Sequence, residues 1–274
     1  MPQITLSWSV SLLFENLPLV TALGRAAHEH LNVVEIWNPY SVSVSETRST
    51  LEALGLKVLL INTDAGDLAT GEWGTGASPG RVNHFKRSFE QSVEYATSLE
   101  IPMIHAMAGN RVSGSSYSAQ RECFLRNLEW ALSLTKGTPL KLLLEPLNNI
   151  DRPDYFLTAM SEAAEIVAEL HDKRIGIMCD IYHLQRGHGN LTEQIQTFAP
   201  LIGHYQFADV PGRHEPGTGE INYANVVRAI VGTGYDGFLG LEYRPTLPIR
   251  TTSQMLGRII ADAEPPARSP NVAS

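Results

Sequence analysis

Short apolar segments of strand length recur along the chain, and longer segments with helical periodicity separate them. Parallel sheets with crossover helices produce this pattern, because the strands are buried on both faces while each helix buries one face. Phe85, Phe89, Val93 and Ala96, for example, recur at the spacing of one helix face. The predicted strands are residues 4–9, 33–37, 57–62, 103–107, 141–145, 175–180, 203–207 and 237–242.

Eight alternations of strand and helix match the dimensions of a closed (β/α)8 TIM barrel, an α/β fold of roughly 250 residues. An open doubly wound sheet is the alternative. No G-x-G-x-x-G or G-x-x-x-x-G-K-[ST] motif follows a predicted strand, which disfavours a nucleotide-binding sheet. We therefore predict a single barrel domain over residues 1–263. Residues 264–274 have no apolar periodicity and are expected to form a flexible tail.

Capping residues mark the ends of two of the predicted helices. Ser45 precedes a helix that runs through Leu54, and Gly55 follows it as the C-terminal cap. Asn222 and Gly232 bracket a second helix in the same manner.

Two predicted loops are longer than simple connectors. Residues 64–81 and 208–220 combine Gly, Pro and polar residues with a few large or charged ones. Because long ordered loops are commonly functional, we expect the first to act as a lid. Trp73 in this loop is expected either to contact substrate or to anchor the loop on the barrel rim.

Composition and charge favour a small-molecule partner. Among 274 residues, 21 Lys and Arg stand against 29 Asp and Glu, which gives a net charge of −8. An acidic chain is poorly suited to hold nucleic acid or an anionic membrane surface, so we predict neither partner. No apolar run approaches the roughly 20 residues that a membrane span needs.

The two cysteines, Cys123 and Cys179, form no C-x-x-C pair and predict neither a disulfide framework nor a thiolate zinc site. Residues 1–10 contain no Lys or Arg and no cleavage pattern, so no signal peptide is expected. These features predict a cytoplasmic protein.

Polar side chains stand at or near the ends of four consecutive predicted strands. They are Glu145, Asp180, Gln206 and Glu242. In a parallel barrel these strand ends meet at one mouth, where active sites lie. Three carboxylates placed together need a cation between them. An all-oxygen donor set favours a hard divalent ion, Mg²⁺ or Mn²⁺.

Cationic and hydrogen-bonding residues near the same mouth suit an anionic substrate. Arg213, His214 and Arg244 are placed to supply positive charge, and His183 is placed to orient a substrate hydroxyl. The expected partner is therefore a small anionic molecule.

Ten short segments resemble, in order and spacing, the hydroxypyruvate isomerase group of the xylose isomerase-like TIM barrel superfamily. The likeness covers residues 6 to 260. The segments are VEIWNPY, INTDAGD, GEWG, SPGR, MAGN, LLEPLN, CDIYH, YQFAD, PGRHEPGTGEINY and LEYRP.

The resemblance implies a metal-dependent isomerase that interconverts hydroxypyruvate and tartronate semialdehyde through an enediolate. It also implies that the metal is held by Glu145, Asp180, Gln206 and Glu242, and that Glu145 and Glu242 form the acid/base pair. Which glutamate is the base is left open. Two residues depart from the pattern: Asp64 replaces a small residue, and Arg244 stands where lysine is common.

Several alternatives stay open. A 2-oxotetronate isomerase or a ketose 3-epimerase would use the same scaffold, although the similar 3-epimerases usually carry His where this chain has Gln206. A DNA-repair endonuclease would require more His ligands and a basic face. A non-catalytic carbohydrate-binding barrel would tolerate loss of metal. The sequence is also compatible with a homo-oligomer.

Overall fold

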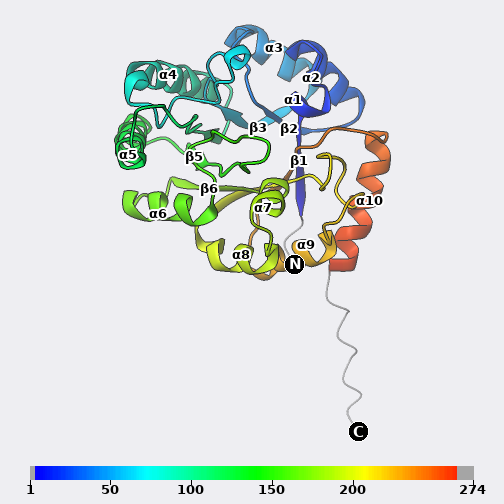
Figure 1. The fold of residues 1–274 in the computed structure, drawn as a ribbon. Coiled ribbons are helices and arrows are strands. Elements are labelled where there is room, and N and C mark those ends of the chain that lie inside the picture. Colours follow the sequence, from blue (N-terminus) through cyan, green and yellow to red (C-terminus); the bar gives the residue numbers. More distant parts are fainter. Residues whose placement is uncertain (1–3, 264–274) are drawn as a thin grey trace.

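A closed barrel of eight parallel strands occupies the centre of the computed structural model, which describes residues 4–263 (Figure 1). The strands pair in chain order, and β1 closes the barrel against β8. The predicted barrel is confirmed, and the open sheet is excluded. The expected tail, residues 264–274, lies outside the described residues. The strands are β1 (Thr5–Ser9), β2 (Val33–Ile36), β3 (Lys57–Asn62), β4 (Met103–His105), β5 (Lys141–Leu144), β6 (Ile175–Asp180), β7 (Ile202–Phe207) and β8 (Phe238–Leu241).

Each predicted strand corresponds to an observed strand, with ends that agree to within two residues. Glu145 and Glu242 directly follow the last paired residues of β5 and β8, whereas Asp180 is the last residue of β6. The polar residues therefore stand where the ladders end and the chain leaves the barrel.

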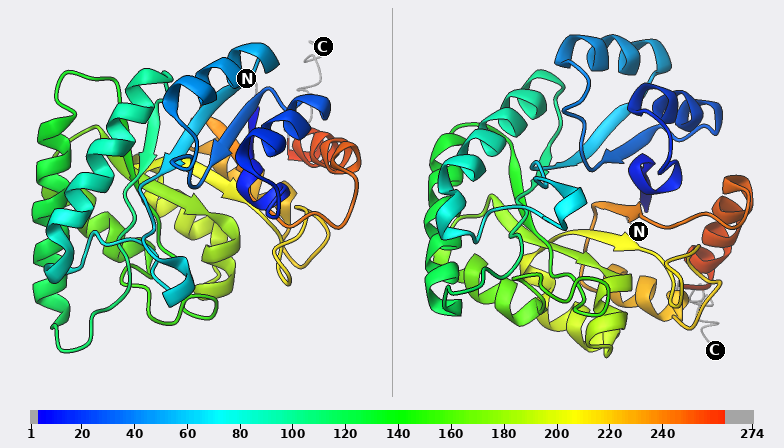
Figure 2. Two further views of the ribbon diagram at one scale, coloured as in Figure 1. Left: turned by 90° about the horizontal axis from the view of Figure 1, so that it is seen from above. Right: turned by 45° about the horizontal axis from the view of Figure 1, so that its top comes forward.

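Helices form an outer layer around the barrel, as the two views in Figure 2 show. Among the described residues, no helix combines the length and hydropathy that crossing a membrane requires. The α-helices are α1 (Val10–Leu13), α2 (Leu19–His28), α3 (Val44–Leu54), α4 (Val82–Ser98), α5 (Tyr117–Leu134), α6 (Met160–Leu170), α7 (Ile181–Gly187), α8 (Leu191–Phe198), α9 (Tyr223–Gly232) and α10 (Ile249–Ala263). The short 3₁₀ turns are η1 (Leu68–Thr70), η2 (Pro79–Arg81) and η3 (Ala199–Leu201).

The start of α3 differs from the prediction. Ser43, not Ser45, is the N-cap: its backbone is extended, and its side chain accepts a hydrogen bond from the backbone N–H of Glu46 at 3.2 Å. The expected C-cap is confirmed, since Gly55 has a φ of 66°. Asn222 caps α9 as expected by accepting a hydrogen bond from the backbone N–H of Asn225. The expected cap at Gly232 is not found, because Gly232 is the last residue of the helix and Thr233 is its C-cap.

Beneath the ends of β3 to β6, the interior of the barrel is apolar. Side chains alternate between the two faces of a strand, so residues two positions apart point the same way. Met103, Leu143 and Met178 therefore lie one layer beneath His105, Glu145 and Asp180, and they pack together with Leu59 and Leu60. This layer supports the polar residues of the mouth.

The loop of residues 64–81 is fastened to the loop that follows β4. Gly74 forms an antiparallel bridge with Ala108, and the backbone N–H of Gly76 donates to Met107 at 3.1 Å. A Cβ at Gly109 would lie 2.3 Å from the carbonyl oxygen of Gly74, so only glycine permits this approach. The predicted lid segment is thus held beside the mouth by backbone contacts.

Candidate active site

The carboxyl-terminal ends of the strands surround a cleft of about 620 Å³. TIM-barrel enzymes carry their active sites at this end, and the volume is typical of a small-molecule site. Asp180 and Gln206 are buried beside the cleft. The other predicted site residues that line it are Trp73, Glu145, His183, Arg213, Glu242 and Arg244.

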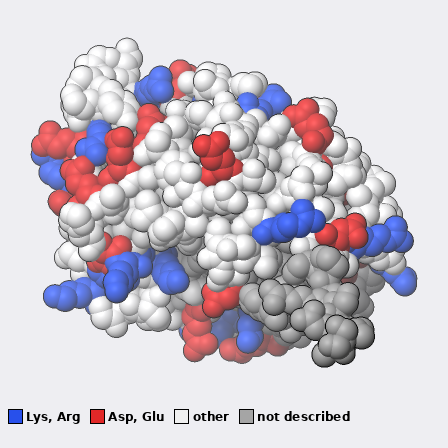
Figure 3. Space-filling model, turned by 90° about the horizontal axis from the view of Figure 1, so that it is seen from below, with Lys and Arg blue, Asp and Glu red and all other residues white. Residues whose placement is uncertain are grey.

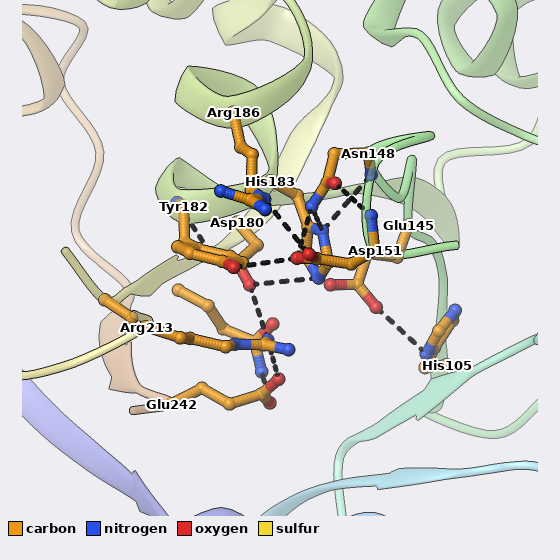
Figure 4. Close-up of polar contacts among 12 residues, drawn as sticks. His105, Glu145, Asn148, Asp151, Asp180, Tyr182, His183, Arg186, Arg213 and Glu242 are labelled. Carbon is orange, nitrogen blue, oxygen red and sulfur yellow. Dashed lines mark hydrogen bonds and ion pairs between the residues drawn. The ribbon is translucent and has the colours of Figure 1, made fainter. Parts of the chain in front are cut away.

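Glu145, Asp180 and His183 approach one another beyond the ends of β5 and β6 (Figure 4). Each offers one potential ligand atom, and these atoms all lie within 4.8 Å of one another. His183 Nε2 is 3.7 Å from Asp180 Oδ2, and His105 Nδ1 is 3.6 Å from Glu145 Oε2. Asp180 is held in place because its other oxygen accepts from the backbone N–H of Tyr182, as the N-cap of α7.

Arg213 connects Asp180 to Glu242. Its Nη2 donates to Asp180 Oδ2 at 2.9 Å and also to Glu242 Oε1. Burial acts to lower the pKa of Arg213, but the attraction of Glu242 and Asp180 raises that pKa above its ordinary value. A charged guanidinium therefore stands in the cleft between two of the predicted ligands.

Glu145, Asp180 and Glu242 all have raised pKa values. Burial is the largest cause for each, because a buried charge loses its hydration. Repulsion from Glu242 and Asp180 adds to the rise at Glu145, and the pKa of Asp180 is raised to about 7 although Arg213 opposes the shift. A divalent cation would offset this repulsion.

Glu242 and Glu145 differ in their hydrogen bonds. Glu242 Oε2 accepts from Trp37 Nε1 at 3.0 Å and from Gln206 Nε2 at 2.8 Å, in addition to the bond from Arg213 to Oε1. Glu145 Oε1 is buried and has no hydrogen-bond partner among residues 4–263. Unlike surroundings for two carboxyls are what an acid/base pair needs, since one can be neutral while the other is charged.

A buried contact between a histidine and a carboxylate beneath the cleft was not predicted from the sequence. His204 Nε2 lies 2.8 Å from Glu35 Oε1, and Ser7 Oγ donates to the same oxygen at 2.5 Å. Burial acts to raise the pKa of Glu35, but the charge of His204 and the hydrogen bonds to the carboxylate lower it below its ordinary value. The available signal was a charged residue inside the apolar segment VVEIW, which signifies a side chain that points into the barrel.

Gln206 is oriented by this pair. Its Nε2 donates to Glu35 Oε2 at 2.7 Å and to Glu242 Oε2, and both acceptors are carboxylate oxygens. The amide NH₂ must face them, so Oε1 points the other way; it is buried and unpaired in the described part of the chain. Gln206 Oε1 and Glu145 Oε1 are thus two buried oxygens without donors, and an all-oxygen set of this kind fits a hard divalent cation.

His183 faces the cleft as a hydrogen-bond donor. Its Nδ1 lies 3.2 Å from the backbone nitrogen of Asn148, which must donate. Burial, followed by the charge of Arg213, lowers the pKa of His183 well below its ordinary value, so the ring is neutral and its N–H is on Nε2. This tautomer suits a contact to a substrate oxygen better than metal ligation. Burial also lowers the pKa of His105, to about 3.

An aromatic wall forms one side of the cleft. The rings of Trp37 and Trp73 meet edge to face with centroids 6.3 Å apart. The guanidinium of Arg152 stacks on Trp73, with Cζ 3.6 Å from the ring centroid. Arg152 lines the cleft and was not among the site residues predicted from the sequence.

The remaining predicted cations lie at the rim. Arg244 Nη2 pairs with Glu15 at 3.3 Å, and both side chains are about half exposed. His214 Nδ1 is 3.0 Å from the carbonyl oxygen of Arg244, and His214 does not line the cleft. The structure therefore brings two of the predicted metal ligands, Glu145 and Asp180, together with His183. Glu242 lies outside that group and is linked to Asp180 through Arg213 and to Gln206 by a hydrogen bond, and His214 does not line the cleft.

Comparison with known proteins places these features in a family. Residues 23–259 match the family model described as xylose isomerase-like TIM barrel. The hydroxypyruvate isomerase of Escherichia coli K12 is 34% identical over 239 residues, which cover 87% of this chain and 93% of that protein. A 2-oxo-tetronate isomerase of Haemophilus influenzae is 33% identical over 86% and 92% of the two chains.

A solved structure is similar over nearly its full length. It is the protein titled AP endonuclease, family 2, from Brucella melitensis, with a TM-score of 0.87 and 30% identity. The match covers 94% of this chain and 99% of that one.

Proposed function

Because this chain belongs to the xylose isomerase-like TIM barrel family, we propose that it is an isomerase that interconverts hydroxypyruvate and tartronate semialdehyde. The relative from Escherichia coli that carries the name hydroxypyruvate isomerase supports this proposal. The observation that carries it is the pair Glu145 and Glu242, two buried carboxyls that line one cleft and have raised pKa values.

The reaction moves hydrogen between neighbouring carbons without a co-reactant. A carboxylate of the pair removes a proton from C3 of hydroxypyruvate, and the electron pair of that bond forms the C2–C3 double bond of an enediolate. The electron pair of the C2 carbonyl moves onto O2. Return of a proton to C2 and transfer of the O3 proton to O2 then leave an aldehyde at C3 and a hydroxyl at C2, which is tartronate semialdehyde. General acid/base catalysis of this kind is typically worth about 10² to 10⁴ in rate.

Different cleft residues would transfer the proton and bind the substrate. Glu145 and Glu242 exchange the proton, and their different hydrogen bonds allow one to be charged while the other is neutral. His183 Nε2–H and the Arg213 guanidinium donate to substrate oxygens. Trp73 and Arg244 line the cleft, and His214 contacts the backbone of Arg244 at the rim. Which glutamate acts first as the base is left to experiment.

The proposed cation is Mg²⁺ or Mn²⁺, held by Glu145, Asp180, Gln206 and Glu242. The unpaired oxygens of Gln206 and Glu145 support this donor set. When bound, such an ion would act as a Lewis acid that polarises the substrate carbonyl and stabilises the developing negative charge, which is worth several kcal/mol.

A four-carbon 2-oxotetronate is the second candidate substrate. The Haemophilus influenzae relative is named for that acid, and a cleft of about 620 Å³ has room for one more carbon. A ketose 3-epimerase would accept neutral sugars, whereas three arginines line this cleft: Arg152, Arg213 and Arg244.

Endonuclease activity is an alternative that the experiment must test, because the similar structure from Brucella melitensis is titled AP endonuclease, family 2. The described residues on the face shown in Figure 3 mix acidic with basic side chains and form no continuous basic surface there. The net charge of −8 supports a small-molecule substrate over DNA.

The test is an NMR assay in D₂O with hydroxypyruvate, 2-oxotetronate, D-fructose or D-tagatose, in EDTA or with added Mg²⁺ or Mn²⁺. A duplex with an abasic site tests the nuclease. We expect deuterium incorporation and isomerisation of hydroxypyruvate with metal, and a loss of at least about 100-fold in Glu145→Gln and Glu242→Gln. Glu122→Gln, on the exposed face of α5, is the control. Full activity of both cleft variants, or activity only on the duplex, would refute the proposal.

A further inference from the structure

Arg152 presents a guanidinium that lacks an anionic partner. It follows β5, and its backbone N–H donates to Asn148 at 3.1 Å, which fixes the position of the chain. Apart from the stacking on Trp73, the side chain makes one hydrogen bond, from Nη1 to the carbonyl oxygen of Asp151 at 3.3 Å. No carboxylate of residues 4–263 forms an ion pair with it.

The neighbouring carboxylate is already engaged by other groups. Asp151 Oδ1 accepts from Arg186 Nε at 3.0 Å. Asp151 Oδ2 accepts from Tyr182 OH at 2.7 Å and from Asn148 Nδ2 at 3.0 Å. Asp151 therefore holds the loop to α7 and leaves the charge of Arg152 without a direct partner.

The other arginines of the cleft are paired with carboxylates. Arg213 donates to Asp180 and Glu242, and Arg244 pairs with Glu15 at the rim. Burial, followed by repulsion from Arg213, lowers the pKa of Arg152. An anion beside Arg152 would relieve this repulsion.

We propose that Arg152, stacked on Trp73, binds the carboxylate of the substrate, an inference that rests on the proposed function and assigns its acid-recognition site. A guanidinium offers two parallel N–H donors to a carboxylate, and stacking on an indole holds that fork in one plane. The wall continues from Trp73 to Trp37, whose Nε1 donates to Glu242. An acid bound at Arg152 thus lies along the wall that leads to the acid/base pair, and Arg152 is a specificity-determining residue.

The first experiment measures binding without turnover. D-Glycerate, a three-carbon acid that cannot isomerise, and glycerol, its neutral counterpart, are titrated by calorimetry into the wild type, Arg152→Met and Arg152→Lys. We expect Arg152→Met to weaken D-glycerate binding by about 10- to 100-fold without changing the response to glycerol. Arg152→Lys keeps the positive charge but loses the two parallel N–H donors of the guanidinium, so its affinity for D-glycerate should lie between those of the wild type and Arg152→Met. Arg126→Met, an exposed arginine of α5 paired with Glu122, is the matched control.

The second experiment measures hydroxypyruvate isomerisation with the same variants. Arg152→Met should raise KM by a similar factor, with a smaller change in kcat. Circular dichroism verifies that each variant is folded. If Arg152→Met does not fold, Arg152→Lys and Trp73→Phe test the carboxylate site in its place, and both should weaken D-glycerate binding.

The outcomes separate this inference from the proposed function. A wild type that binds D-glycerate through Arg152 but does not isomerise hydroxypyruvate would refute the function and retain the carboxylate site. An active wild type whose folded Arg152 variants keep both the KM and the D-glycerate affinity would refute the carboxylate site alone. A wild type that fails to bind D-glycerate would also refute the site.

Discussion

At the scale of single residues, hydrogen-bond partners decide what a polar side chain can do. Gln206 could present either end of its amide to the cleft. Because Glu35 and Glu242 both accept from its Nε2, its oxygen is the end left available. Asp151 shows the same principle in another role, since Arg186, Tyr182 and Asn148 occupy both of its oxygens and make it a structural anchor for the loop after β5.

Because Asp151 anchors the loop after β5, we expect the wild type and Asp151→Asn to differ in stability by an amount that depends on pH. Burial acts to raise the pKa of Asp151, but the hydrogen bonds from Asn148 and Tyr182 and the charge of Arg186 lower it below its ordinary value. The ionised form is therefore favoured by folding, and its contribution is present above the unfolded pKa of about 4 and lost as the pH falls through the lower folded pKa. Asp151→Asn should cost about 1 kcal/mol at pH 7, because the carboxylate is about a third exposed and partly screened.

Urea denaturation of the wild type and Asp151→Asn at pH 7, 5, 4 and 3 checks this expectation. The difference in the free energy of unfolding should shrink below about pH 4. Asp154→Asn, an exposed neighbour, is the control and should change little. A difference that grows on acidification would contradict the assignment.

At the scale of elements, backbone contacts between two loops place Trp73 beside the cleft. Gly74 and Gly109 have φ angles of 98° and 89°, and their backbones touch where residues 64–81 meet the loop after β4. Without side chains at these two positions, the loops can approach closely enough for the bridge between Gly74 and Ala108. The aromatic wall depends on this contact.

Gly109→Ala should separate the two loops. The added methyl would lie 2.3 Å from the carbonyl oxygen of Gly74, whereas the same change at Gly114, with a φ of 79°, meets nothing within 4 Å. Both substitutions share the strain of a positive φ, so the difference between them isolates the clash. We expect Gly109→Ala to cost about 1–3 kcal/mol more than Gly114→Ala and to increase hydrogen exchange over residues 64–81. Equal costs and equal exchange would show that this contact does not hold the loop.

At the scale of the whole molecule, closure of the barrel brings together groups that repel one another. Glu145, Asp180 and Glu242 come from three strands, and burial together with their mutual repulsion makes their charged forms unfavourable. Arg213 offsets part of this cost at Asp180 and Glu242, and a cation that binds only the folded protein would offset more of it.

Divalent ions should therefore raise the thermal stability of the chain. At a free Mn²⁺ concentration of about 100 times Kd, we expect a gain of about 2.7 kcal/mol, or roughly 5–10 °C in Tm, with reversal by EDTA. Glu145→Gln should reduce the response, while the exposed Glu122→Gln should keep it. Differential scanning calorimetry gives the measurement, and an unchanged Tm in wild-type protein at saturating Mg²⁺ and Mn²⁺ would argue against the cation site.

The sequence by itself determined the barrel and the strand ends at its mouth, because burial on both faces produces short apolar strands and each strand must end where the chain turns outward. Glu145, Asp180, Gln206 and Glu242 could be found in this way since their positions follow from periodicity alone. Tertiary structure decided how these side chains are oriented and paired. Glu35 and His204 meet across the barrel, and Arg152 meets Trp73 from a different loop. Such contacts join residues far apart in the chain. A local sequence pattern therefore does not predict which distant side chain a polar group will contact.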